Sequence, residues 1–362
     1  MPTRWFDAHL DLACLAAMGR DMAAPVVASM GPWPPASVTL DSLRRGGVTR
    51  FLGTIFTEAG GTDAGVSYAI GDAEGAHAAG IAQLATYRAW EKLGLLRLEG
   101  LGSKGMKSSR EAALRCSLLM ECADPIREPG ELEWWVERGV VAVGLAWGRG
   151  SRYAAGNMQD PASDPGLTPM GRALVRGIDE IGVVHDIAHL SDRALADLLA
   201  ATDKPVIASH SNCRAIIASE GLAPECIPES LRAHPDGARI ILQRHLTDET
   251  IREVARRGGV IGLNLYSAFL IPGAVRSRRA RVYEAVAHVD HICELVGHTR
   301  AVGLGSDMDG GFSGACLPDG VQTPSDLGLL LDALRELGWS DDDLERFAWR
   351  NWSEFFAVRV GV

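Results

Sequence analysis

The sequence predicts an α/β fold, a (β/α)8 TIM barrel that forms a single domain over residues 1–362 and carries loop insertions at its C-terminal face. Three observations predict it: short apolar runs rich in Val, Ile and Leu occur eight times, amphipathic segments separate them, and most of the runs are continuous instead of alternating. Continuous apolar runs are typical of parallel strands that are covered on both faces. Eight alternations of strand and helix then favour a closed parallel barrel.

The predicted strands are the eight apolar runs themselves. They comprise residues 4–12, 48–57, 116–122, 140–147, 182–189, 205–211, 259–266 and 301–307. Segments 22–37 and 148–170 are rich in Pro, Gly and small residues and are predicted to be long loops on the barrel.

The segments between the runs carry helix signals. Ser191 is the predicted N-cap of a helix that continues to about Thr202, with Leu195, Leu198 and Leu199 on one face. Thr247 is the predicted cap of the helix that ends at Gly258-Gly259. Longer helices are expected over 74–93 and 280–297, and two more after Gly310, near 324–337 and 341–348.

The composition excludes several classes of protein. The net charge is −10, whereas proteins that follow a nucleic-acid backbone usually present a basic surface. No 18-residue apolar run exists, so no membrane span is expected, and the N-terminus has no apolar signal core. Seven cysteines without a CxxC motif do not resemble a disulfide framework. We therefore expect a cytoplasmic protein with neither a nucleic-acid nor a membrane partner.

Ionisable residues lie at or near the ends of the apolar runs, at the strand ends where TIM barrels place their active sites. They are His9 and Asp11 at the end of the first run, Glu121 at the end of the third, His189 at the end of the fifth, His210 at the end of the sixth and Asp307 at the end of the eighth. His9 and Asp11 are two residues apart, so on a strand they share a face. His189 and His210 are 21 residues apart, about one βα repeat. Such a set could hold two divalent ions. Its mixture of nitrogen and oxygen donors favours zinc over calcium.

Each of these residues also has a simpler interpretation. A lone His-x-Asp is a weak signal, His189 by itself is more often a hydrogen-bonded core histidine, and Glu121 by itself is a surface strand end. It is their occurrence together, each after a separate predicted strand, that favours a metal site. The simpler interpretation is preferred for four other features. His185 is expected to be a structural histidine, and Trp134-Trp135 to be packing residues. Cys122 and Cys213 are expected to be unreactive thiols, and the basic segment Arg276–Arg281 to be a solvated face or lid.

Longer motifs resemble those of a known family. The segment VVHDIAHLSDRALADLLAATDKPVIASHSNCRAI, residues 183–216, is similar to the membrane (renal) dipeptidase family of the amidohydrolase superfamily. Four further segments match in the family's order, and they are FDAHLDL near the start, QRHLTDETIREVARRGGVIGLNLYSAFL at 243–270, HVDHICELVG at 288–297 and VGLGSDMDGGF at 302–312. The resemblance covers nearly the whole chain.

The resemblance implies a binuclear zinc enzyme that hydrolyses dipeptides. It implies that His9 and Asp11 bind the first ion, that Glu121 bridges both ions, and that His189 and His210 bind the second. Asp307 matches the acid/base carboxylate beside the bridging hydroxide. Arg244 matches the arginine that holds the C-terminal carboxylate of the substrate, a task that suits a planar guanidinium.

Two positions depart from the family pattern. Family members often carry a histidine after the fourth strand, where this chain has Trp147, which offers one indole donor and no cation. The bridging glutamate is usually followed by glycine, whereas Glu121 is followed by Cys122-Ala-Asp-Pro. Neither departure removes a metal ligand, but both bear on substrate identity. We expect Trp147 and Tyr266 to contact the substrate together with Arg244, and Arg149 or Arg152 to be able to replace the missing donor.

These observations predict a metal-dependent dipeptidase with a small-molecule or dipeptide substrate. A homodimer is left open. Two alternatives also remain open at this point, which are an amidohydrolase of another substrate class (an N-acyl amino acid, a cyclic amide or a lactone) and a non-catalytic binding protein on the same barrel.

Overall fold

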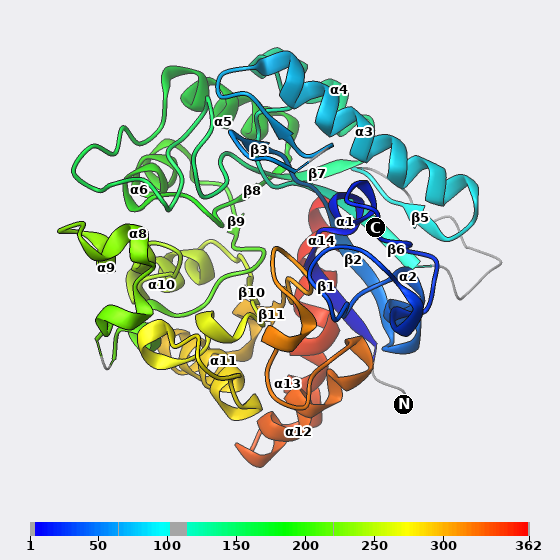
Figure 1. Cartoon of the computed structure of the whole chain (residues 1–362), viewed down its shortest axis with the longest axis vertical. Helices are drawn as coiled ribbons and strands as arrows, with labels where there is room; N and C mark the ends of the chain where they lie inside the picture. The colour runs from blue at the N-terminus through cyan, green and yellow to red at the C-terminus, as the bar shows by residue number, and fades with distance from the viewer. Residues whose placement is uncertain (1–3, 64, 102–113, 220, 361–362) are drawn as a thin grey trace.

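The computed structural model describes residues 4–63, 65–101, 114–219 and 221–360, and in them the predicted barrel is present (Figure 1). Eight parallel strands lie in the order β10-β11-β1-β2-β6-β7-β8-β9, and a parallel bridge between Ala208 and Ile261 links the two ends of this series. The strands are β1 (Trp5–Leu10), β2 (Val48–Ile55), β6 (Leu114–Met120), β7 (Val140–Gly144), β8 (Val184–Asp186), β9 (Val206–Ile207), β10 (Ile261–Leu263) and β11 (Val302–Leu304). Each falls within or overlaps one predicted run.

Three short strands were not predicted. The strand β5 (Leu96–Leu98) pairs with the first residues of β6. The strands β3 (Glu58–Ala59) and β4 (Ser67–Tyr68) form a separate two-stranded sheet in the segment that follows β2. That small sheet gives structure to a segment beside the strand ends.

Helices follow the strands and surround them (Figure 1). They are α1 (Leu12–Ala17), α2 (Leu40–Arg45), α3 (Ala73–Lys92), α4 (Leu132–Val136), α5 (Pro169–Ile181), α6 (Asp192–Ala201), α7 (Arg214–Ala218), α8 (Glu229–Arg232), α9 (Gly237–Leu242), α10 (Asp248–Arg256), α11 (Val282–Val296), α12 (Gly328–Glu336), α13 (Asp341–Glu345) and α14 (Asn351–Val360). Ser191 and Thr247 cap α6 and α10 as predicted, because each side chain accepts a hydrogen bond from the backbone N–H three residues later. The helix predicted over 341–348 is too short, since a π-helical turn over Arg346–Arg350 joins α13 to α14.

The apolar core has two parts. The larger part lies between the strands and the surrounding helices. The smaller part takes buried side chains from seven of the barrel strands or their first flanking residues, for example Phe6, Leu52 and Val141, and packs them against the aromatic residues Trp352 and Phe356 of α14. In Figure 1 the red helix α14 runs behind the strands at the centre of the ring. The C-terminal helix therefore covers one end of the barrel and leaves the opposite end for the site.

The regular strands end earlier than the apolar runs. Strand β8 ends at Asp186 and β11 at Leu304, three residues before His189 and Asp307 respectively. His189 and Asp307 both have positive φ, 64° and 57°. This conformation is uncommon for residues other than glycine and often marks a functional position. The backbone thus turns at these residues and directs their side chains over the end of the barrel.

Among the described residues, no helix combines the length and the apolar character that crossing a membrane requires.

Candidate metal centre and substrate pocket

The residues predicted to bind metal converge on one cavity of about 340 Å³, a volume that suits a small ligand. The cavity is lined by Asp11, Glu121, His189, His210 and Asp307, together with the predicted substrate contacts Trp147, Arg244 and Tyr266. His9 is fully buried and reaches the same carboxylates from beneath them. All nine predicted site residues therefore meet in one place.

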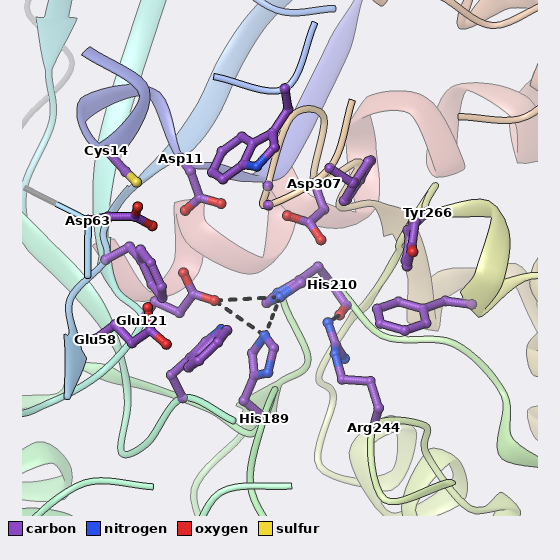
Figure 2. Close-up of a pocket in the computed structure, with 17 residues that line it drawn as sticks. Asp11, Cys14, Glu58, Asp63, Glu121, His189, His210, Arg244, Tyr266 and Asp307 are labelled. Atoms are coloured by element: carbon purple, nitrogen blue, oxygen red, sulfur yellow. Dashed lines mark hydrogen bonds and ion pairs between the residues drawn. The ribbon is translucent and has the colours of Figure 1, made fainter. Parts of the chain in front are cut away.

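Glu121 occupies the centre of the cluster (Figure 2). Its Oε2 atom lies 3.5 Å from His9 Nε2, and its Oε1 atom lies 3.3 Å from His189 Nε2 and 3.8 Å from His210 Nε2. On the first side, His9 Nε2 also lies 3.6 Å from Asp11 Oδ1. The two carboxylate oxygens thus face two different groups of donors, which is the arrangement that a bridging carboxylate requires.

The donor atoms fit divalent cations. His189 Nδ1 lies 3.1 Å from the amide oxygen of Asn157, and His210 Nδ1 lies 2.8 Å from Ser209 Oγ, so both imidazoles have an outward partner for an Nδ1–H. Their Nε2 atoms, only 2.9 Å apart, then face each other with lone pairs. Among the described residues, the buried His9 Nε2 and Glu121 Oε2 atoms have no hydrogen-bond partner. Lone pairs crowded together in this way are stabilised by a cation and are costly without one.

The pKa values of the residues in the cluster bear on metal binding as well. Burial, with Asp11 nearby, raises the pKa of Glu121 to about 7. Burial lowers the pKa of His9, but the carboxylates of Glu121 and Asp11 outweigh it and hold that pKa well above the usual range. Burial, together with the positive charges of Arg244 and His9, holds the pKa values of His189 and His210 well below it. Neutral imidazole is the form in which histidine binds a metal, and the lowered pKa values keep His189 and His210 in that form. His9, whose pKa is raised, has to release a proton when it binds a cation.

Asp307 lies beside the donor cluster. Its Oδ2 atom accepts a hydrogen bond of 2.7 Å from the Asn264 amide, and its Oδ1 atom lies 3.9 Å from His9 Nε2. Burial and the neighbouring carboxylates of Asp11 and Glu121 hold the pKa of Asp307 well above its usual range. A carboxyl group that is fixed at one oxygen and raised in pKa is suited to exchanging a proton.

Arg244 approaches the cluster from the segment between α9 and α10. Its guanidinium donates to the carbonyl of His210 at 2.8 Å and to Ser211 Oγ at 3.3 Å, and it lies over the ring of Phe269. The residue is only 6% exposed, yet within the described part of the chain no carboxylate lies within ion-pair distance of it. Its Nε–H has no partner there either. A buried cation of this kind calls for an anionic ligand.

Aromatic residues form much of the remaining lining. Trp147 packs edge-on against Phe56, with ring centroids 5.4 Å apart, and its ring lies 5.9 Å from that of His189. On the side of Arg244, Tyr266 stacks on Phe312 and meets Phe269 edge-on. The pocket therefore has an aromatic wall on each side of the donor cluster.

Several lining residues were not found from the sequence. Cys14, Trp33, Phe56, Glu58, Asp63, Phe269 and Phe312 line the cavity. Most lie in connecting segments, where no periodic pattern marks them. The loop that carries Trp33 is tied to the site because Asp309 accepts hydrogen bonds from the backbone N–H groups of Ser37 and Val38 and pairs with Arg20.

The simpler interpretations of other features agree with the structure. His185 lies 2.7 Å from Asp179 of α5 and does not line the cavity. Trp135 is buried and packs edge-on against Trp134. Cys122 and Cys213 are buried, and burial raises the pKa of both thiols.

The arginines near Trp147 have other partners. Arg149 pairs with Glu58 at 2.9 Å, and Arg152 binds the carbonyls of Asp124 and Ile126. Neither lines the cavity, so neither stands where the missing histidine donor would be. In the basic segment, Arg278 pairs with Glu284, and Arg279 binds the carbonyls of Leu317, Pro318 and Val321.

Comparisons with known proteins agree with this geometry. A sequence model of a family described as membrane dipeptidase (peptidase family M19) matches residues 3–223 and 237–357. A Klebsiella pneumoniae protein, described as an uncharacterized protein in the pqqA 5' region, is 29% identical over 229 residues, which is 62% of this chain and 74% of that protein.

Two solved structures share the fold over essentially the full length of both chains. One is the dipeptidase AC, a metallopeptidase of family M19, with a TM-score of 0.76, 21% identity and 100% of each chain covered. The other is a metallopeptidase from Rhodobacter sphaeroides, liganded with a phosphinate mimic of the dipeptide L-Ala-D-Ala, with a TM-score of 0.78, 21% identity and coverage of 99% of this chain and 100% of that one.

Proposed function

The chain belongs to the membrane dipeptidase family, peptidase family M19, and on that premise we propose that it is a zinc-dependent dipeptidase for small dipeptides with a free C-terminal carboxylate. Membership makes it a metallo-dipeptidase in class. The metal, the number of ions and the form of the substrate are the parts that we propose.

One observation carries the proposal, which is the placement of the buried Arg244 beside a cluster of metal donors. Arg244 lines the same cavity as Glu121, His189, His210 and Asp307. A dipeptide presents a carboxylate a few bonds away from its scissile carbonyl. A guanidinium that lacks an acidic partner and lies next to the donor cluster can therefore hold the substrate by one end while the peptide bond lies over the cluster.

The donor cluster provides two places for cations. His9 and Asp11 would hold one ion, His189 and His210 the other, and Glu121 one oxygen of each. Bound ions would polarise the scissile carbonyl and make a water molecule acidic enough to attack it at neutral pH. Imidazole and carboxylate donors together suit zinc.

The protein's own residues do the remaining work. Arg244 orients the substrate through its carboxylate. Asp307 takes the proton of the attacking water and delivers it to the leaving amine, while the Asn264 amide holds its other oxygen in place. The aromatic residues of the wall keep bulk water from the reacting bond.

The charge of the pocket supports an orientation for the substrate. Figure 2 shows Glu58 and Asp63 on the side of Glu121 that is opposite to Arg244. Glu58 shares its charge with Arg149, whereas no arginine, lysine or histidine of the described segments pairs with Asp63. A zwitterionic dipeptide with its carboxylate at Arg244 places its amino end toward these acids.

A substrate panel tests the function. Zinc-reconstituted protein is assayed against free dipeptides of L,L and L,D configuration, the same dipeptides with amidated C-termini, and N-acyl amino acids. We expect the free dipeptides to be cleaved fastest. Preferential cleavage of N-acyl amino acids would contradict the dipeptidase proposal and favour an amidohydrolase of that class.

The seven cysteines are all unpaired, which supports our proposal that the protein works in a reducing compartment such as the cytoplasm.

A further inference from the structure

The same hydrogen-bonded unit occurs twice beneath the donor cluster. In the first copy, Asp7 of β1 accepts the backbone N–H of Ser306 at 2.8 Å and the Ser306 hydroxyl at 2.5 Å. In the second copy, Asp186 of β8 accepts the backbone N–H of Ser209 at 2.9 Å and the Ser209 hydroxyl at 2.6 Å. We call these units the Asp7–Ser306 clamp and the Asp186–Ser209 clamp.

The two clamps match in detail. Each joins neighbouring parallel strands, β1 with β11 and β8 with β9. In each, the aspartate Oδ1 atom also accepts the backbone N–H two residues later, that of His9 or of Ala188. In each, the serine directly precedes a proposed functional residue, Asp307 or His210. All four clamp residues are buried.

The clamps differ in what the serine oxygen faces. Among the described residues, the one donor to Ser306 Oγ is the backbone N–H of Met308, at 3.3 Å. Ser209 Oγ faces two imidazoles, with His210 Nδ1 at 2.8 Å and His9 Nδ1 at 3.3 Å. The Asp186–Ser209 clamp therefore touches two of the three histidines in the donor cluster.

The chemistry of a hydroxyl then fixes the direction of these bonds. Ser209 has one hydroxyl proton, and it donates that proton to Asp186. Its oxygen can only accept from the two imidazoles, so each must carry a proton on Nδ1. A neutral imidazole with a proton on Nδ1 has its lone pair on Nε2, and the Nε2 atoms of both histidines face Glu121.

The backbone of Ser209 is also held in place. A Cβ atom at Gly262 or at Gly305 would overlap the carbonyl oxygen of Ser209, so a glycine on β10 and a glycine directly after β11 allow the close approach. The serine is therefore fixed by its backbone, by Asp186 and by the two rings.

We propose that Ser209, held by Asp186, is a positioning residue that fixes His9 and His210 in the Nδ1–H form and so directs two metal-binding lone pairs into the cluster. This inference rests on the proposed metal centre. The Asp7–Ser306 clamp has the same hydrogen bonds but does not fix an imidazole through its serine, and it positions Asp307 instead. Partners that hold a metal-binding imidazole from behind commonly matter for affinity.

The experiment compares two matched deletions of a hydroxyl, Ser209→Ala and Ser306→Ala, in the full chain. Zinc affinity is measured by competition with a chromophoric chelator. We expect Ser209→Ala to weaken zinc binding by about 10- to 100-fold, and Ser306→Ala to leave it within about threefold while lowering kcat. Equal zinc affinities in the parent and Ser209→Ala would overturn the proposal, and so would an equal loss in both variants.

A second measurement needs no variant and no substrate. Protein labelled with 15N at histidine, free of metal, reports by nuclear magnetic resonance which ring nitrogen of His210 carries the proton. We expect Nδ1 in the parent and in Ser306→Ala, and a shift of the proton to Nε2 in Ser209→Ala. A proton on Nε2 of His210 in the parent would overturn the proposal even if the protein were a dipeptidase. Conversely, failure of the dipeptide assay would leave both of these measurements unaffected.

Discussion

The two parts of the pocket are held in different ways. The strand-end cluster is defined as His9, Asp11, Glu121, His189, His210 and Asp307. These residues are buried, apart from the partly exposed His189, and are hydrogen-bonded to the barrel through both clamps, Asn157, Asn264 and Thr54. The loop wall, defined as Trp33, Phe56, Glu58, Asp63 and Trp147, lies in the connecting segments after β1, β2 and β7. In the part of the chain that the structure describes, the one ion pair of Glu58 is with Arg149, whose side chain is 54% exposed.

From this contrast we infer that the strand-end cluster carries out the reaction and that the loop wall selects the substrate. Strand register fixes the positions of the residues in the strand-end cluster, so a substitution of one of them disturbs the other proposed metal donors as well. Residues of the loop wall depend on local chain path and can change without moving the donors. Substitutions in the cluster should therefore change turnover or metal binding, and substitutions in the wall should change the range of substrates.

The largest effect is expected within the strand-end cluster. Asp307→Asn removes the carboxylate that we propose exchanges the proton but keeps a group of similar size, so kcat should fall by at least about 10²-fold. KM and bound zinc should change little. Steady-state kinetics and elemental analysis of the variant check this. Near-normal turnover on the best dipeptide would show that Asp307 has another role.

The next effect tests Arg244, which belongs to neither part and lies on the side of the strand-end cluster that is opposite to Glu58 and Asp63. Arg244→Met removes charge-assisted hydrogen bonds to the substrate carboxylate, so KM for free dipeptides should rise by about 10- to 100-fold. Dipeptides with an amidated C-terminus are the matched control, because they should be poor substrates for the parent and change little in the variant. Equal parent rates on acids and amides would remove the assigned role.

The pH dependence of zinc binding tests whether Glu121 carries a proton in the metal-free protein. Burial raises the pKa of Glu121 to about 7, so the metal-free protein holds a proton there at lower pH and must release it to bind a cation. Affinity should therefore rise with pH, and binding at pH 6 should be about tenfold weaker than at pH 8 for this one proton. Calorimetric titrations at the two pH values measure it. An affinity that does not vary with pH would contradict the assignment of Glu121.

The smallest effect is expected in the loop wall. Trp147→His introduces the ring type that the family resemblance leads us to expect at this position, and it adds a donor near His189. A single hydrogen bond is worth about 1 kcal/mol, so kcat/KM on a broad L,L-dipeptide panel should rise by roughly fivefold. Bound zinc should stay constant, which serves as the control. An unchanged panel would contradict the proposal that Trp147 narrows the pocket and leaves the reaction without a donor.

The sequence predicted the strand-end cluster better than the loop wall. Apolar runs reveal buried strands, and an ionisable residue directly after such a run is conspicuous, which is why His9 and Glu121 were found. Glu58 and Asp63 were missed because they follow β2 in a segment where no period marks which side chains turn inward. Asp7, Asp186, Ser209 and Ser306 were missed for another reason, since their partners lie on neighbouring strands and only register brings them together.

The central claim is that the strand-end cluster holds two divalent ions. The most direct measurement is elemental analysis of the protein after zinc is supplied at neutral pH and excess metal is removed, with His189→Ala and His210→Ala beside it. We expect close to two ions per chain in the parent and selective weakening of one ion in each variant. A parent that retains no metal under these conditions would contradict it.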